Sequence, residues 1–479
     1  MLFNSFSFLI FFPIIFILYW FVTQRNLKWQ NIMLLIASYY FYACWDWRFL
    51  FLLVFSTGLD FFTGLKMEEC TSKKQKQFWF WLSVILNLGF LGIFKYYNFF
   101  VSSFATGLAN MGLHINVYTL KVILPVGISF YTFHGLSYVI DIYKEKIKAE
   151  KNFVDYSLFV SYFPLLVAGP IERATHLLPQ IKVPRTFNAN NAIVGVELMA
   201  WGFFKKVVIA DSMSLLVNKV YANPTAYDST SLVIAAIAFS FQIYCDFSGY
   251  SDIAIGCSKI LGIDLLQNFN FPYLSRNIAE FWRRWHISLS SWFRDYIYIP
   301  LGGSKLSMVL NIRNVFVIFI VSGIWHGANF TFIIWGTIHA LLFIPSFVMG
   351  SNKKYKQDIV HQGKMLPSIK DLVMMAITFF FVTLAWIFFR AENVSQAFTY
   401  ITSIATNAVG KKLVFENTEL MGYLFSYITL FLGSTYWLYV KTNLYKPSRA
   451  MQFSIALLLL IVIAFFGQFS KQSFIYFQF

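Results

Sequence analysis

The sequence predicts an all-α polytopic membrane protein, on the evidence of its charge content, apolar runs and aromatic content. Of its 479 residues 58% are hydrophobic and only 13% are charged, whereas a soluble domain carries about 25% charged residues. Apolar runs of about twenty residues recur along the chain, which is the length that a helix needs to cross a bilayer. Aromatic residues make up 20% of the chain, and this suits lipid-facing helices and interfacial belts.

Span length and hydropathy predict about twelve transmembrane helices. They are expected over residues 5–22, 30–45, 48–65, 78–94, 123–142, 192–210, 231–249, 308–325, 331–349, 371–389, 418–440 and 451–468. An even number of spans puts both termini on one side, which we expect to be the outer side. Residues 153–171 are interrupted by prolines and predict a re-entrant segment, and residues 96–122 have room for another helix. Lys205 and Lys206 fall within a predicted span and need a partner, a cavity or an interface.

The chain is predicted to form one membrane-embedded domain over residues 1–479, with its most informative motifs in 241–340. The net charge of +16, from 38 Lys and Arg against 22 Asp and Glu, fits positively charged cytoplasmic loops. No nucleic-acid-binding motif accompanies it. The four cysteines show no metal-ligand spacing. These observations favour a lipid bilayer as the surroundings and argue against a nucleic-acid partner or a metal site.

The segment FWRRWHISLSSWFRDYIYIPLGG, residues 281–303, places many charges among aromatic residues. Asn277 and Glu280 have the spacing of a capping box and predict a helix that starts near Ile278. Apolar residues then continue at helical spacing until Pro300. We therefore expect one amphipathic helix, with the side chains of Trp282, His286, Leu289 and Phe293 along one side.

Two histidines and one aspartate in the apolar part of the chain are candidate site residues. His326 follows a Val- and Ile-rich run in GIWHGAN, residues 323–329, where small neighbours allow close approach and Asn329 is able to orient an imidazole or a carbonyl. Ionisable groups at membrane depth are costly and usually functional. His286 is either functional or a hydrogen-bonded packing residue. Asp246, in CDFSGYSDIAIG, is expected to lie near a membrane boundary and to pair with a nearby arginine.

At these motifs the chain resembles the membrane-bound O-acyltransferase superfamily, in its bacterial AlgI-like and DltB-like branch. The resemblance covers nearly the whole chain, and the blocks 268–303 and 323–329 in that order are its most specific part. The matching segments are MLFNSFSFLIFF, LPVGISFYTFHGLSYVIDIY, FPLLVAGPIER, FQIYCDFSGYSDIAIG, NFNFPYLSRNIAEFWRRWHISLSSWFRDYIYIPLGG, GIWHGAN and FIYFQF.

The resemblance implies a ring of helices around a central tunnel in the cytoplasmic (inner) membrane of a bacterium. It implies that His326 is the essential histidine of the family and His286 its second histidine. It also implies an acyl thioester such as acetyl-coenzyme A as donor substrate, with no bound cofactor. The acceptor is a cell-envelope polysaccharide, alginate-like or peptidoglycan. The expected partner is a separate extracytoplasmic acetyltransferase, similar to AlgJ, AlgX or PatB.

With that function, His326 is expected to remove the proton of the acceptor hydroxyl, and an acyl-histidine intermediate is the alternative. Asn329, backbone N–H groups near Gly327, or His286 would supply hydrogen bonds to the oxyanion. Several charged residues are candidates for binding the donor phosphates or for structural pairing with one another, with Glu280 or with lipid headgroups. These residues are Arg283, Arg284, Arg294 and Asp295.

Three other functions fit the same motifs. The first is D-alanyl transfer to teichoic acid, as in DltB-like members of the family. The second is a transporter or flippase that uses the same tunnel, although the chain lacks the paired broken repeats common in transporters. The third is a conduit that hands acetyl groups to the extracytoplasmic partner.

Overall fold

The computed structural model describes residues 1–120, 124–355, 367–407, 429–430, 432–434, 447–469 and 475. These residues form helices and loops and contain no β-strand, which confirms the all-α fold class. The chain divides into two compact units. The first unit is Met1–Gly195 with Cys257–Leu266, and the second is Val196–Gly256 with Gln267–Phe479. The single functional domain over 1–479, with its main motifs in 241–340, stays a prediction.

Seven helices of the described part are long and apolar enough to cross a membrane, so the chain is a multi-pass membrane protein. They are Arg48–Glu69, Lys73–Asn110, Ser229–Ile260, Met308–His326, Phe330–Val348, Ile369–Arg390 and Arg449–Phe466. Other predicted spans form shorter helices, such as α2 (Leu27–Ala43) with 17 residues and α6 (Ile128–Tyr143) with 16. The predicted span at 418–440 lies mostly outside the described residues, and the ring of about twelve helices around a tunnel stays a prediction.

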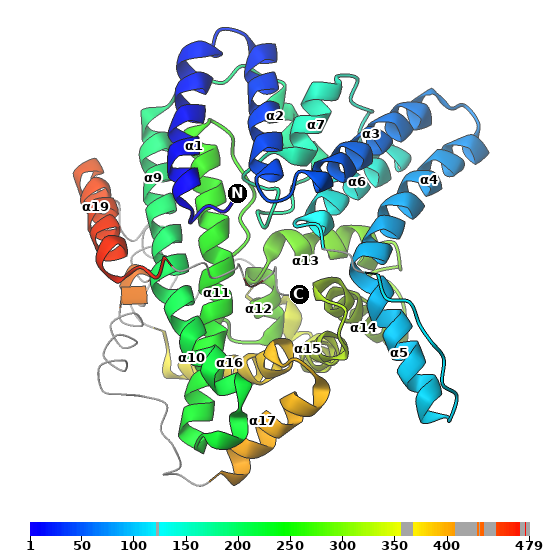
Figure 1. Cartoon of the computed structure of the whole chain (residues 1–479), viewed down its shortest axis with the longest axis vertical. Coiled ribbons are helices and arrows are strands. Elements are labelled where there is room, and N and C mark those ends of the chain that lie inside the picture. The colour runs from blue at the N-terminus through cyan, green and yellow to red at the C-terminus, as the bar shows by residue number, and fades with distance from the viewer. Residues whose placement is uncertain are drawn as a thin grey trace. The chain divides into compact units, whose positions relative to one another are not determined.

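Helices of the first unit pack around a buried polar network between α3 and α4. The carboxylate of Asp60 accepts hydrogen bonds from the Ser83 hydroxyl (2.6 Å) and the Asn87 amide (2.7 Å). In this unit α3 and α4 both pack against α6 (Figure 1). Its elements, apart from α2 and α6, are α1 (Phe6–Ile17), η1 (Leu18–Val22), α3 (Arg48–Glu69), α4 (Lys73–Leu91), η2 (Gly92–Tyr96), α5 (Tyr97–Asn110), α7 (Phe153–Ser161) and α8 (Ala174–Ile181).

The first unit contains the two regions, 96–122 and 153–171, for which the sequence predicted no simple span. The helix expected within 96–122 is present as α5. The segment 153–171 begins as helix α7, and its remaining residues form buried turns with no further helix. Its proline-interrupted half is therefore irregular, and its re-entrant course through the membrane stays a prediction. Two further helices, α9 (Ala189–Phe203) and α11 (Ser229–Ile260), have residues in both units.

The second unit contains the motifs that resemble the acyltransferases. In it α14 and α15 pack side by side (Figure 1). Its remaining elements are η3 (Phe204–Ala210), α10 (Asp211–Ala222), η4 (Pro224–Ala226), η5 (Pro272–Leu274), α12 (Ile278–Arg284), α13 (Ile287–Phe293), η6 (Arg294–Tyr298), α14 (Met308–His326), α15 (Phe330–Val348), η7 (Ser351–Lys353), α16 (Ile369–Arg390), α17 (Val394–Thr406) and α19 (Arg449–Phe466).

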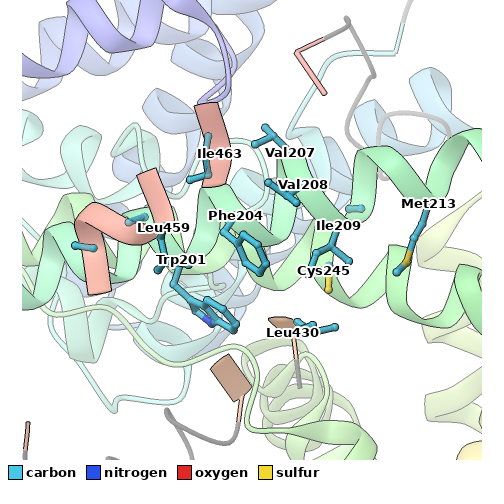
Figure 2. Close-up of a cluster of buried hydrophobic side chains, with 13 residues drawn as sticks. Trp201, Phe204, Val207, Val208, Ile209, Met213, Cys245, Leu430, Leu459 and Ile463 are labelled. Atoms are coloured by element: carbon cyan, nitrogen blue, oxygen red, sulfur yellow. The ribbon is translucent and has the colours of Figure 1, made fainter. Parts of the chain in front are cut away.

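A buried apolar cluster joins η3, α11 and α19 of this unit. Figure 2 shows Phe204 near Leu459 and Ile463 of α19, with Cys245 of α11 at the other side. Close approach of α9 and α11 depends on a glycine pair, because a Cβ at Gly249 would lie 2.7 Å from the Gly202 carbonyl oxygen. A larger side chain there would push the two helices apart.

Two lysines that the sequence placed at membrane depth have acidic partners. The Lys205 ammonium lies 2.6 Å from Asp252, and the Lys206 ammonium lies 2.8 Å from both Asp211 and Asp246. Buried charges are tolerated when they are paired in this way. The partner of Asp246 is therefore a lysine, and the expected pairing of Asp246 with an arginine is wrong, because η3 places Lys206 against Asp246 of α11. Asp246 also accepts a hydrogen bond from the backbone N–H of Ile475 (2.8 Å).

Candidate active site

The charged segment forms two short helices where one long helix was expected. Helix α12 begins after the Asn277 cap, whose side chain accepts a hydrogen bond from the Glu280 N–H (2.8 Å), as predicted. The helix stops at Arg284, and α13 starts again at Ile287. His286 between them has φ +44° and ψ +54°, in the left-handed region that few residues other than glycine adopt. The continuous helix with His286 along one side is wrong.

Backbone pairing with an earlier segment explains the break. The Asn270 N–H donates to the Arg284 carbonyl (2.9 Å), and the Ile287 N–H donates to the Asn268 carbonyl (2.9 Å). These bonds use backbone groups that a continuous helix would have bonded within itself. A non-glycine residue in the left-handed conformation costs about 1–3 kcal/mol, and it persists only where the surrounding structure holds it. The pairing with residues 268–270 therefore fixes where His286 lies.

The side chain of Asn268 holds the imidazole of His286. Its Oδ1 lies 2.9 Å from His286 Nδ1 and accepts a second hydrogen bond from the Ser288 hydroxyl (2.9 Å). Its Nδ2 donates to the Ser251 hydroxyl (3.2 Å). The other ring nitrogen, His286 Nε2, is buried and has no hydrogen-bond partner among the described residues. The phenyl ring of Phe247 meets the imidazole edge to face at 4.6 Å.

Burial controls the protonation of His286, which lies outside the seven candidate spans. It lowers the pKa of His286 to about 3, with no charged neighbour in the described part of the chain contributing. The imidazole is consequently neutral near pH 7.

His326 lies at the end of α14 inside a box of aromatic rings, and only 4% of the residue is exposed. The rings of Trp325, Trp335 and Phe389 have their centroids 4.8, 5.0 and 5.1 Å from the imidazole, all close to edge-on. The box excludes bulk water, and a Cβ added at Gly327 would overlap the Phe332 ring that closes it. The small residue after His326 is therefore needed for packing as well as for approach.

Aromatic side chains link the two histidines to a third. The indole of Trp325 contacts both imidazoles, with centroid distances of 5.9 Å to His286 and 4.8 Å to His326. The indole of Trp335 lies against His326 and also against His339 (4.9 Å). His339 is fully buried, and its Nδ1 accepts a hydrogen bond from the Trp282 N–H (3.2 Å). All of these residues belong to the second unit.

The three arginines do not form one common binding site. Arg283 donates to the carbonyl oxygens of Asn352 and Lys354 (2.8 and 2.9 Å). Arg284 forms a buried ion pair with Glu280 (2.6 Å), which is one of the structural pairings expected for these residues. Arg294 forms an exposed pair with the neighbouring Asp295 (2.7 Å). Each guanidinium has structural partners, so the role of any of them in binding a donor stays a prediction.

Asn329 caps the next helix. Its Oδ1 accepts a hydrogen bond from the Thr331 N–H (3.0 Å), and its Nδ2 donates to the Glu392 carbonyl (2.7 Å). Both ends of the amide are thus committed to structure, and its role toward an oxyanion stays a prediction. No group of three or more His, Cys, Asp or Glu side chains in the described ranges has the arrangement of a metal site.

Asn268 and the aromatic box were not identified from the sequence. Asn268 lies eighteen residues before His286 in the segment NFNFPYL, and no helical period connects them. Trp335 and Phe389 were expected only as parts of spans. These residues contact the histidines from segments that are distant in the sequence, and the spacing of residues along one helix does not reveal such contacts.

Comparison with known proteins identifies the family of this chain. The model of the MBOAT, membrane-bound O-acyltransferase family matches residues 143–387, which include both histidines and the Trp325 and Trp335 rings and end two residues before Phe389. The chain belongs to the membrane-bound O-acyltransferase family. It is accordingly a membrane-bound O-acyltransferase, and the identification as an enzyme is confirmed.

Relatives within the family cover most of the chain. A probable alginate O-acetylase from Pseudomonas aeruginosa is 41% identical over 397 residues, which are 82% of this chain and 72% of the relative. A peptidoglycan O-acetyltransferase from Helicobacter pylori is 35% identical over 426 residues, 83% of this chain and 78% of the relative. A teichoic acid D-alanyltransferase from Bacillus subtilis is 30% identical over 288 residues, 56% of this chain and 69% of the relative.

Proposed function

We propose that this O-acyltransferase moves acetyl groups from a cytoplasmic thioester, most simply acetyl-coenzyme A, toward hydroxyls of a cell-envelope polysaccharide. The observation that carries the proposal is the 41% identity with a probable alginate O-acetylase over 82% of the chain. The similarity to a peptidoglycan O-acetyltransferase supports the same class of reaction with a different glycan. Both relatives are named for acetyl transfer, so acetyl is the acyl group that we propose for this chain.

His326 acts as the base in this reaction. Its neutral imidazole accepts the proton of the attacking hydroxyl while the oxygen bonds to the thioester carbonyl carbon. The carbon–sulfur bond then breaks, and the released thiolate takes up the proton. One ester and one thiol result from one alcohol and one thioester. The surrounding aromatic rings keep bulk water from the ring, which protects a thioester or an acyl-histidine alternative from hydrolysis.

The remaining site residues have supporting roles in the proposal. His286 lies close to the same Trp325 indole as His326, and we assign it a place beside the reacting groups. Backbone N–H groups near Gly327 stabilise the oxyanion, with Asn329 as a further donor. Arg283, Arg284, Arg294 and Asp295 border the donor site, and Asp246 supports the packing behind it.

The proposed setting is the cytoplasmic membrane of a bacterium, with both termini outside. The immediate acetyl recipient is either the polysaccharide itself or an extracytoplasmic acetyltransferase that completes the transfer. The loops rich in Lys and Arg support a cytoplasmic donor side.

The proposal is tested by measuring ester-linked groups on the envelope polysaccharides of the native host. Acetate and D-alanine, released by mild alkali, would be quantified by mass spectrometry in the wild type, a deletion strain, and deletion strains carrying the wild-type or His326→Ala gene. We expect acetate esters to disappear on deletion and to return only with the wild-type gene. Unchanged acetate esters in the deletion strain would refute the proposal.

D-Alanyl transfer is the second candidate. It is favoured by the 30% identity with a teichoic acid D-alanyltransferase over 56% of the chain. The same experiment separates the two candidates, because loss of D-alanine esters with retained acetate would favour D-alanyl transfer. The lower identity and shorter coverage of that relative make acetyl transfer the better supported reaction.

A further inference from the structure

Three features of His286 need a common explanation. It is a non-glycine residue in the left-handed region, one of its ring nitrogens has a single side-chain partner, and the other has none among the described residues. A packing histidine would be expected to have both nitrogens satisfied or one at the surface. His286 has neither, since 1% of it is exposed. The arrangement thus holds at a fixed position a ring nitrogen, Nε2, that has no hydrogen-bond partner within the described part of the chain.

We propose that Asn268 is a positioning residue that keeps the proton of His286 on Nδ1, so that Nε2 faces the reaction as a hydrogen-bond acceptor. This inference rests on the proposed function of the site. It assigns His286 to binding an acceptor hydroxyl or another proton-bearing group. It removes His286 from the possible donors to an oxyanion, because a neutral imidazole with its proton on Nδ1 has no N–H at Nε2.

In the structure the amide oxygen of Asn268, and not its amide nitrogen, lies against the imidazole of His286. Oδ1 meets two side chains able to donate, His286 Nδ1 and the Ser288 hydroxyl, while Nδ2 points to the Ser251 hydroxyl. A carbonyl oxygen accepts two hydrogen bonds, so both donors are satisfied by one atom. With Oδ1 toward the ring, the Nδ1 atom of His286 must carry the proton.

The backbone of Asn268 makes a separate contribution. Its carbonyl accepts the Ile287 N–H (2.9 Å) and holds the turn in which His286 lies. Substitution of the side chain leaves this bond in place, so the effect of the amide is separable from the effect of the turn. Among the described residues, the aromatic rings of Phe247, Phe269 and Trp325 also pack against the imidazole.

The first test observes the proton directly in the wild-type protein. The full chain would be labelled with ¹⁵N-histidine in lipid bilayers, and its spectrum compared with that of His286→Gln to assign the ring of His286. We expect a protonated Nδ1 and an unprotonated Nε2 near pH 7. A spectrum with the proton on Nε2 would overturn the proposal without affecting the assignment of acetyl transfer.

The second test compares substitutions of Asn268 by transfer of labelled acetyl from acetyl-coenzyme A to envelope polysaccharide in native membranes. Asn268→Ala should lower transfer by roughly 10–100-fold, as when a group that orients a functional histidine is lost. Asn268→Asp retains an acceptor oxygen, and its carboxylate raises the pKa of the neighbouring imidazole. We therefore expect Asn268→Asp to transfer acetyl faster than Asn268→Ala above pH 8. As the pH is lowered, the activity of Asn268→Asp should begin to fall at a higher pH than that of the wild type.

The matched control is Asn311→Ala, which removes another buried asparagine of the second unit. The Asn311 amide donates to the Leu306 carbonyl (2.9 Å), a backbone group outside the turn that holds His286. Wild-type transfer by this variant supports a specific role for Asn268. The proposal is overturned if Asn311→Ala lowers acetyl transfer as much as Asn268→Ala does. It is also overturned if transfer by Asn268→Asp is at no pH faster than transfer by Asn268→Ala. Wild-type transfer by Asn268→Ala, together with loss of transfer by His286→Ala, would refute the role of Asn268 and leave the proposed function intact.

Discussion

His286 lies at a kink between two short helices and is held by a polar side chain, whereas His326 ends a helix of 19 residues and is held by aromatic rings. Both imidazoles are nearly fully buried. The polar contact specifies the position of a proton as well as the position of the ring. The aromatic contacts specify the position of the ring and exclude water without selecting a tautomer.

This difference suits two roles. A base that changes protonation during each reaction cycle must be able to take up and release a proton. A group that only accepts a hydrogen bond is better fixed in one state. The two histidines are therefore expected to respond differently to substitutions around them.

Removing His326 should have the largest effect on activity. His326→Ala should lower acetyl transfer by about 10²–10⁴-fold, because none of the rings around it is able to accept a proton. The measurement is the rate of labelled acetyl transfer at equal amounts of folded protein. His114→Ala, in an exposed position, is the control and should retain the wild-type rate. A folded His326→Ala protein with the wild-type rate would contradict the proposed role of this residue.

Removing Trp335 from the aromatic box should lower both the stability of the protein and the rate of acetyl transfer. Trp335 is fully buried and contacts His326 and His339, so Trp335→Ala should destabilise the protein by about 3–5 kcal/mol. Thermal unfolding in detergent measures this change. Trp201→Ala, in the apolar cluster of Figure 2, should be destabilising as well but should not reduce transfer below the melting temperature. Equal transfer by both variants would indicate that the box is not needed for chemistry.

Acid should destabilise the protein through His286. The folded pKa of about 3 lies below the usual value near 6.5. The unfolded chain therefore binds more protons between these two pH values, and stability falls as pH falls. The contribution is about 1.4 kcal/mol per pH unit in that window. Between pH 6.5 and 5, the wild type should lose about 2 kcal/mol more than His286→Gln does.

The pKa of His176 is shifted in the opposite direction from that of His286, so its effect on stability should have the opposite dependence on pH. Its hydrogen bond with Glu172 (2.8 Å) raises the pKa of His176 above its usual value, although burial opposes the shift. Its contribution to stability is complete below pH 6.5 and is lost as the pH rises through the folded pKa. His176→Gln should therefore lose stability at acidic pH, where His286→Gln gains relative to the wild type. Parallel acid curves for His286→Gln and the wild type would contradict the burial effect on His286.

The fold was predictable where it depends on local sequence. Apolar length predicted the helices at 308–325, 331–349 and 371–389 within a few residues of α14, α15 and α16. Asn277 predicted the start of α12. The break at His286 was not predictable, because the apolar period continues across it. Its cause is backbone pairing with Asn268, which only the tertiary structure provides.

The candidate site was predictable only in part. His286 and His326 were identified because an ionisable group within an apolar chain needs a reason to be there. Their partners were not identified, because an asparagine in a loop and a tryptophan in a span are common in membrane proteins. Asp246 was identified with the wrong partner, since the sequence gives no distance to Lys206. Spacing along one helix finds residues on one face and misses contacts between segments.

The smallest expected effect concerns Ser288, the second donor to Asn268 Oδ1. Ser288→Ala should destabilise the protein by about 1 kcal/mol, the usual net value of one hydrogen bond, because His286 Nδ1 still donates to the same oxygen. Acetyl transfer should stay within a few-fold of wild type. Ser291→Ala is the matched control, since that hydroxyl donates to the Ser288 carbonyl (2.9 Å), a backbone group of the same turn. A loss of transfer as large as that of Asn268→Ala would mean that Ser288, and not the direct bond to the imidazole, sets the orientation of His286.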